Sequence, residues 1–260
     1  NGDGQFNHIG QFSFSQDGAI WAVDKLGHRV HHFKQSGELI KTIGSGIPGD
    51  GPGELSGPTG IAVSRLSSSI FISEGGNHRI SQLQSDGAFL RILPTPGLGC
   101  PGCISLSPDE KTLAVVGRLA HCIKLVQVDG TTTPKTIGVH GSRDGQFNLP
   151  CDVCFTPDGQ QLVVADLGNH RVQVLSLDGS FVRKIELGDD ARAVAVDAAG
   201  NIIATTTQCV KVFSPDGRLL HEQLGGGFEL GEFAVAGLAI DPGSGRIAAA
   251  CMGAGLIRLL

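Results

Sequence analysis

Tyrosine is absent from this chain of 260 residues, and aromatic side chains of any kind are scarce. Trp21 is the one tryptophan, and twelve phenylalanines complete an aromatic content of 5%. Proteins that hold single-stranded nucleic acid stack its bases on exposed aromatic side chains and usually carry a basic excess. This chain has a net charge of −5, so its composition argues against a general nucleic-acid-binding surface.

Long apolar runs are also missing. No run approaches the roughly 18–20 residues that span a bilayer, and no charged-then-apolar leader is visible, so we expect no membrane partner. The seven cysteines are odd in number and scattered. This pattern favours reduced thiols and a cytoplasmic location, with an extracellular location as the alternative.

Glycine is abundant, at 39 of 260 residues, and the chain repeats itself. The segment 3–7 recurs unchanged as 144–148, and a turn with the pattern (Asp/Glu)-x-x-(Gly/Asn)-His-Arg occupies 24–29, 74–79 and 166–171. Three degenerate copies bring the count to six, at a spacing typical of propeller blades. We expect an all-β, six-bladed propeller in one domain, with four antiparallel strands in each blade. Its expected blades span about 1–43, 44–93, 94–137, 138–187, 188–224 and 225–260.

The Asn169-His170-Arg171-Val172 turn and the strand at 58–63 (Pro-Thr-Gly-Ile-Ala-Val) resemble NHL repeats. The resemblance covers essentially the whole chain. It implies the six-bladed propeller of tripartite-motif ubiquitin ligases, where this domain recognises protein or RNA. The last expected blade departs from the family pattern, because only three strands fit before the chain stops. Its outer strand is therefore expected to be missing, which leaves residues 256–260 as an exposed edge.

The repeated turn motif invites a catalytic or metal-binding interpretation. A site needs residues that converge at one place, however, whereas these copies lie in different blades. We therefore interpret the carboxylates as acceptors for backbone N–H groups of the turn and as partners of arginine, with Asn77 and Asn169 in the left-handed conformation.

Two Cys-x-x-Cys pairs, Cys100/Cys103 and Cys151/Cys154, are too far apart for a zinc ribbon. The second pair lies on an expected strand, where residues three apart point to opposite faces. Cys154 is expected to be a small inner-strand residue, and Trp21 a core residue. A cluster of Cys103 and Cys151 across two blades stays open as a weaker metal-binding hypothesis.

One mouth of the central channel is expected near a set of equivalent inner-strand positions: Gln11, Gly60, Cys103, Asp152, Ala193 and Gly237. One carboxylate and one amide make a poor calcium site. Amidating lyases with a similar fold use an essential tyrosine, which this chain lacks. We therefore expect no cofactor and no enzymatic activity in the domain itself, although its parent protein could be a ubiquitin ligase.

The leading functional hypothesis is a binding platform for a protein partner. Its binding surface is the loop face, formed by the loops that lead into the blades and by the turns between second and third strands. RNA binding by the same face and a metal-dependent lyase or hydrolase are the alternatives. The candidate binding residues are Lys25, His28, Arg118, Arg143, Asp152 and Arg192.

Overall fold

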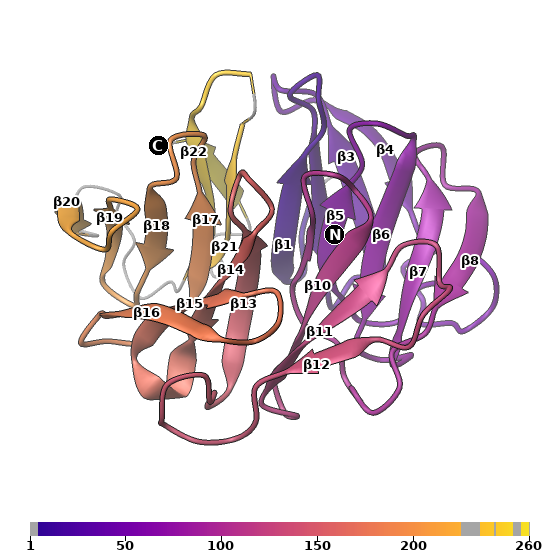
Figure 1. Cartoon of the computed structure of the whole chain (residues 1–260). Helices are drawn as coiled ribbons and strands as arrows, with labels where there is room; N and C mark the ends of the chain where they lie inside the picture. Colours follow the sequence, from indigo (N-terminus) through magenta and orange to yellow (C-terminus); the bar gives the residue numbers. More distant parts are fainter. Residues whose placement is uncertain (1–4, 225–234, 242, 252–255, 260) are drawn as a thin grey trace.

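The computed structural model describes residues 5–224, 235–241, 243–251 and 256–259. Its strands form antiparallel sheets in which neighbours in sequence are also neighbours in space, and five of these sheets are four-stranded propeller blades (Figure 1). Blade 1 consists of β1 (Ile9–Phe14), β2 (Ile20–Asp24), β3 (Arg29–Phe33) and β4 (Leu39–Ile43). Blade 2 consists of β5 (Pro58–Val63), β6 (Ser69–Glu74), β7 (Arg79–Gln84) and β8 (Phe89–Leu93). Blade 3 consists of β9 (Ile104–Leu106), β10 (Thr112–Gly117), β11 (Cys122–Gln127) and β12 (Lys135–Ile137).

The remaining sheets follow the same order. Blade 4 consists of β13 (Pro150–Phe155), β14 (Gln161–Asp166), β15 (Arg171–Ser176) and β16 (Phe181–Glu186), with a short 3-10 turn, η1 (Leu167–Asn169), after β14. Blade 5 consists of β17 (Ala193–Val196), β18 (Ile202–Thr205), β19 (Cys209–Phe213) and β20 (Leu219–Leu224). A three-stranded sheet consists of β21 (Val235–Ile240), β22 (Ile247–Cys251) and β23 (Leu256–Leu259).

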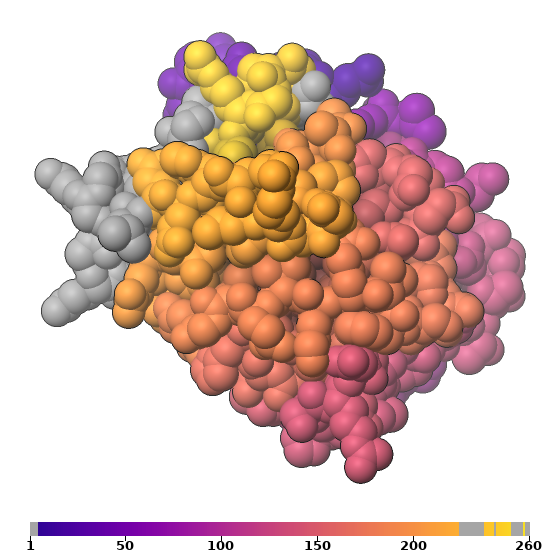
Figure 2. Space-filling model, turned by 60° about the vertical axis from the view of Figure 1, so that its left-hand side comes forward, coloured from indigo at the N-terminus to yellow at the C-terminus, as the bar shows by residue number. Residues whose placement is uncertain are grey.

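The first strands of the sheets surround the axis. β1, β5, β9, β13, β17 and β21 contact one another in that order, and β21 also contacts β1. Figure 2 shows the outer surface, where the yellow residues near the C-terminal end lie next to the orange residues of blade 5. The two ends of the described chain therefore meet at one place in the ring.

The number of blades differs from the sequence-based prediction of six, of which the last was expected to lack its outer strand. We expected six blades, and the structure has five four-stranded blades beside the three-stranded sheet. The repeat count alone does not fix the number of complete blades, because a complete blade also needs a fourth strand. Among the described residues, none pairs with the free edge of β23.

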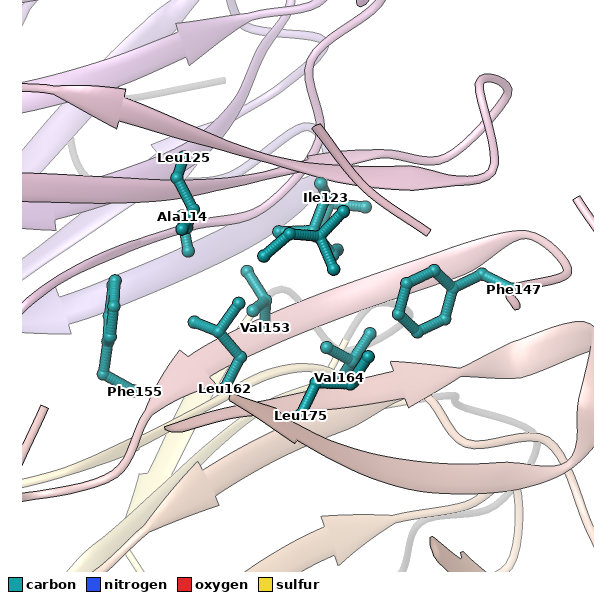
Figure 3. Packing of buried hydrophobic residues seen from close by; sticks show 11 residues of the cluster. Ala114, Ile123, Leu125, Phe147, Val153, Phe155, Leu162, Val164 and Leu175 are labelled. Carbon is teal, nitrogen blue, oxygen red and sulfur yellow. The ribbon is translucent and has the colours of Figure 1, made fainter. Parts of the chain in front are cut away.

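The hydrophobic core lies between successive blades. Figure 3 shows the interface of blades 3 and 4, where Ile123 and Leu125 of β11 pack with Val153, Leu162 and other apolar residues of blade 4. Both faces of a blade carry apolar side chains. Each blade therefore needs a neighbour on each side, because one blade cannot bury both of its faces alone.

Equivalent positions of the inner strands carry small residues opposite larger ones. Ser13 pairs with Trp21 in β2, and Cys154 pairs with Val163 in β14. Trp21 is 2% exposed, which confirms its prediction as a core residue. Small side chains relieve crowding where the inner strands converge on the axis.

Candidate functional site

The repeated turn motif forms a buried ion pair in each of its three full copies. The Nε atom of Arg29 lies 3.2 Å from a carboxylate oxygen of Asp24. In the other two copies, Arg79 Nε lies 2.8 Å from Glu74 and Arg171 Nε lies 2.8 Å from Asp166. All three carboxylates are fully buried. The structural interpretation of the motif is therefore confirmed.

The motif also fastens each blade to the loop that precedes it. Asp166 accepts hydrogen bonds from the Asn148 backbone N–H at 2.7 Å and from Asn169 Nδ2 at 2.8 Å. Arg171 Nη2 donates to the backbone carbonyls of Arg143 and Gln146, at 2.9 Å each. Because the carboxylate and the guanidinium form these hydrogen bonds within the protein, few of their polar atoms remain to bind a ligand.

The left-handed residue of the turn differs from the prediction. Histidines take this conformation, at φ 49° for His28, 54° for His78 and 54° for His170, in place of the expected asparagines. The side chain of Asn169 instead binds Asp166 and the Gly141 carbonyl, which holds the asparagine within the turn.

His28 and His121, the left-handed histidine of the equivalent turn in blade 3, connect neighbouring blades. His28 Nδ1 accepts a hydrogen bond from the Gly57 backbone N–H at 3.0 Å, and His121 Nδ1 accepts one from the Leu149 N–H at 3.0 Å. His28, a candidate binding residue, therefore has a structural bond on the loop that leads into blade 2.

Asp152 lies at the centre of the most unusual electrostatic environment. It is 3% exposed and accepts hydrogen bonds from its neighbour Val153 N–H at 2.9 Å and, across the blade boundary, from Val194 N–H at 3.0 Å. Burial raises the pKa of this carboxyl to about 7, although these two bonds and one from the Cys103 thiol oppose the shift. Asp152 thus changes its charge near neutral pH.

The thiols around Asp152 are poor nucleophiles. Burial, reinforced by the nearby carboxylate, raises the pKa of both Cys103 and Cys151. Cys151 donates to the backbone carbonyls of Ala191 and Arg192, at 3.0 Å each. We call Cys103, Cys151 and Asp152 the axial cluster.

The expected opposite orientation of Cys151 and Cys154 is wrong. The pairing of β13 with β14 shifts register between Pro150 and Asp152, and both cysteines pack against the same apolar cluster of blades 4 and 5. A β-bulge adds one residue to a strand and so reverses the side on which the preceding residue lies. Within the described part of the chain, no group of three or more histidine, cysteine or carboxylate side chains has the geometry of a metal site.

Two arginines lie close enough to the axial cluster to act on it electrostatically. Although burial dominates the pKa of Cys151, the positive charges of Arg118 and Arg192 lower it. Arg118 is exposed on the turn between β10 and β11. Arg192 precedes β17, its Nη2 lies 3.3 Å from Asp190, and its buried Nε has no hydrogen-bond partner among the described residues.

The structure thus brings three of the six candidate residues to one place: Arg118, Asp152 and Arg192. Lys25 and Arg143 are exposed on other segments of the loop face, between β2 and β3 and between β12 and β13. The remaining candidate, His28, lies in the same turn as Lys25.

Gln11 has a role that the sequence analysis missed. Its Oε1 accepts hydrogen bonds from the Ile61 N–H in blade 2 and the Ile104 N–H in blade 3, both at 3.0 Å. Its Nε2 donates to the Ile104 carbonyl at 2.9 Å. Gln11 occupies the same position of the repeat as Asp152. This shared position could have predicted that both polar side chains bond to neighbouring inner strands.

Comparison with known proteins agrees with this architecture. The NHL repeat profile matches residues 147–175. NHL repeat-containing protein 3 of Mus musculus is 30% identical over 192 residues, which cover 66% of this chain and 54% of that protein. Peptidyl-glycine alpha-amidating monooxygenase A of Xenopus laevis is 25% identical over 74% of this chain and 17% of its own length. The chain therefore spans about half of the first relative and a small part of the second.

A gluconolactonase from Xanthomonas campestris has the same fold, with a TM-score of 0.75 at 18% identity, over 98% of this chain and 87% of that one. The prediction that the domain is not an enzyme is corrected by these comparisons, because its relatives include an amidating monooxygenase and its fold occurs in a gluconolactonase. The absence of tyrosine and the poor calcium site were therefore insufficient grounds for the prediction that the domain is not an enzyme.

None of the described helical segments is long and apolar enough to cross a membrane. The profile match, the relative in mouse and the repeated ion-paired turns agree with one another. The chain carries an NHL repeat and is similar to an NHL repeat-containing protein.

Proposed function

We propose that this propeller binds a peptide segment of a partner protein on its loop face, with Arg118 and Arg192 contacting carboxylates of that segment. The domain would serve as the recognition part of a larger protein. This extends a general binding role, which the NHL-repeat fold supports, to a particular place on the surface.

The observation that carries the proposal is the contrast between two classes of arginine. Arg171 has its guanidinium committed to Asp166 and to two backbone carbonyls. Arg192 has one carboxylate partner, and its Nε has none among the described residues. An incompletely bonded guanidinium beside an exposed one suits a carboxylate ligand, because charge-assisted hydrogen bonds are the strong ones.

Exposed apolar side chains in the loops of the same face favour a peptide. Leu119, adjacent to Arg118, is 74% exposed, and Val139 in the loop leading into blade 4 is 61% exposed. Exposed aliphatic groups beside cations match a ligand that carries both acidic and apolar residues. The carboxylates of Asp189 and Asp190 beside Arg192 interrupt the continuous positive surface that a phosphate backbone needs, whereas a peptide with one or two carboxylates needs only the two arginines.

The test combines affinity capture with binding measurements on peptides. The propeller is used as bait with and without RNase, and segments of the captured proteins are then measured by fluorescence anisotropy. We expect acidic segments to bind, and the double variant Arg118→Ala/Arg192→Ala to bind at least tenfold more weakly, since about 1.4 kcal/mol of lost interaction corresponds to tenfold in Kd. Arg65→Ala, an exposed arginine in the β5–β6 turn of the opposite face, is the matched control. Loss of all captured proteins on RNase treatment, or equal binding by the double variant, would contradict the proposal.

Acid–base catalysis is a second candidate function, favoured by the pKa of Asp152 near 7. A carboxyl with that pKa suits proton transfer at neutral pH. The substrates to try are a glycine-extended peptide and gluconolactone, the compounds indicated by the names of the similar enzymes. Turnover that is lost in Asp152→Asn would support this function, whereas turnover that persists in this variant, or its absence with both compounds, would speak against it.

A further inference from the structure

A cavity of about 250 Å³ lies between blades 1 and 2, on the face opposite the loop face. It is bounded by the β1–β2 turn, the β5–β6 turn and strand residues from both blades. Six of its eleven lining residues are serines, and Trp21 and Val63 add apolar surface; the serines are Ser15, Ser64, Ser67, Ser68, Ser69 and Ser85. The axial cluster does not line this cavity.

Blade 1 places a histidine where blades 3, 4 and 5 have an aliphatic residue and blade 2 has Gln82. His32 of β3 pairs in register with Trp21 and stacks on its ring, with centroids 3.9 Å apart and planes 12° apart. The equivalent pair in blade 4 is Val163 and Val174, both fully buried against blade 5. The cavity therefore occupies part of an interface whose counterpart between blades 4 and 5 is filled by apolar side chains.

The imidazole of His32 lacks hydrogen bonds. Both ring nitrogens are buried, and neither has a partner among the described residues. Burial first and the Lys41 ammonium second lower the pKa of His32, while Asp17 acts in the opposite direction. The ring is neutral at pH 7, so it has one donor and one acceptor that are both unused. A buried polar group without a partner in a native protein calls for an explanation, such as a bound molecule.

The turn on the blade 2 side also departs from the repeat. In blades 1 and 4 the turn is held by a hydroxyl that donates a hydrogen bond to an aspartate two residues later. In blade 1 this bond joins the Ser15 hydroxyl to Asp17, at 2.5 Å. The turn at 64–69 has no aspartate and is held by the next blade: Glu110 accepts from the Ser64 hydroxyl and the Arg65 N–H, at 2.5 Å each. This outside support leaves the hydroxyl-bearing segment 67–69 at the wall of the cavity.

We propose that this cavity binds a small, uncharged, polyhydroxylated molecule with the size and chemistry of a monosaccharide. Serine hydroxyls and a neutral imidazole each donate and accept hydrogen bonds, as the hydroxyl groups of such a ligand do. The two nearby charges, Asp17 and Lys41, have opposite signs, and Lys41 is already committed to the Ser85 carbonyl and the face of Trp21. An ion of either sign would therefore meet a like charge. The volume lies below the roughly 300–1,000 Å³ of sites for drug-sized ligands, which fits a single sugar ring.

The experiment is a titration of the full chain followed by NMR of its histidine side chains. The probes are glucose, galactose, mannose and inositol, with sodium phosphate and ammonium chloride as ionic probes, and the variant His32→Gln assigns the His32 signals. We expect at least one of the four polyols to shift these signals in a saturable way, and Ser68→Ala/Ser85→Ala to weaken that binding at least fivefold. Ser36→Ala, in the β3–β4 turn of blade 1 and outside the cavity lining, should leave it unchanged. Three results would overturn the proposal: no saturable shift with any polyol, which would mean a water-filled cavity, a response to the ionic probes alone, or unchanged affinity in the double serine variant.

Discussion

Two arginines in equivalent turns of neighbouring blades differ in how they bind within this molecule. Arg171 is 3% exposed and pairs with a fully buried Asp166, whereas Arg118 projects from the equivalent turn of blade 3 into solvent. A buried pair is costly to break, because removal of one partner leaves the other charge buried and uncompensated. An exposed arginine without such a partner contributes little to stability.

The variants Arg171→Ala and Arg118→Ala should therefore differ sharply in stability. We expect Arg171→Ala to lower the free energy of unfolding by about 3–5 kcal/mol, since it strands the Asp166 carboxylate. Arg118→Ala should change it by no more than about 0.5 kcal/mol. Urea unfolding followed by circular dichroism measures both, and equal losses would contradict the structural role of the motif.

Asp152 makes a pH-dependent contribution whose sign follows from its raised pKa. The carboxyl has a pKa of about 7 in the folded protein against 3.8 without perturbation, so the folded state holds its proton more tightly. Its contribution to stability is complete below about pH 4 and is lost as the pH rises through about 7. The difference in unfolding free energy between the wild type and Asp152→Asn should fall by about 4 kcal/mol over this range. Unfolding curves at several pH values test this, and a difference that stays constant from pH to pH would rule out the shift.

At the scale of strands and turns, the sequence predicted what depends on local chemistry. Apolar alternation bounded by Asp-Gly and Gly-Asn turns located the strands of blade 4, and the repeat placed Trp21 in the core. It did not reveal the bulge that turns Cys151 to the same side as Cys154, because a bulge depends on how two strands align and not on one residue. Nor could it show that the β5–β6 turn depends on Glu110, which lies 46 residues from Ser64.

Substitution of Glu110 tests whether one blade supports a turn of the neighbouring blade. Glu110 adopts φ 57°, a conformation in which the corresponding turns of blades 1 and 4 have glycine, and its carboxylate holds the turn at 64–69. Glu110→Gly should relieve about 1 kcal/mol of backbone strain while removing those bonds, so global stability should change little. We expect amide hydrogen exchange at Arg65 and Leu66 to rise at least tenfold, and exchange in the β13–β14 turn to stay constant as an internal control. Unchanged exchange at Arg65 and Leu66 would show that the turn holds itself.

At the scale of the whole ring, side chains near the axis join blades that the strand ladders leave separate. Gln11 links blade 1 to blades 2 and 3, and Asp152 links blade 4 to blade 5. The candidate site was predictable only in part: the repeat indicated which inner-strand positions face the mouth. The approach of Arg118 and Arg192 to the axial cluster depends on the curvature of the assembled ring.

Replacement of Gln11 by alanine measures that coupling. Gln11→Ala leaves the N–H groups of Ile61 and Ile104 buried without an acceptor, and each unsatisfied group costs about 1–3 kcal/mol, so we expect a loss of roughly 2–6 kcal/mol. Gln160→Ala, an exposed residue that bonds only within its own turn, is the control and should be nearly neutral. Trp21 fluorescence reports on blade 1, and circular dichroism reports on all the sheets, so denaturant curves from the two probes can be compared. If the axial side chains make the ring a single cooperative unit, Gln11→Ala shifts both curves by the same amount. An earlier transition of the Trp21 signal alone would mean that blade 1 unfolds separately and that Gln11 stabilises only its own neighbourhood.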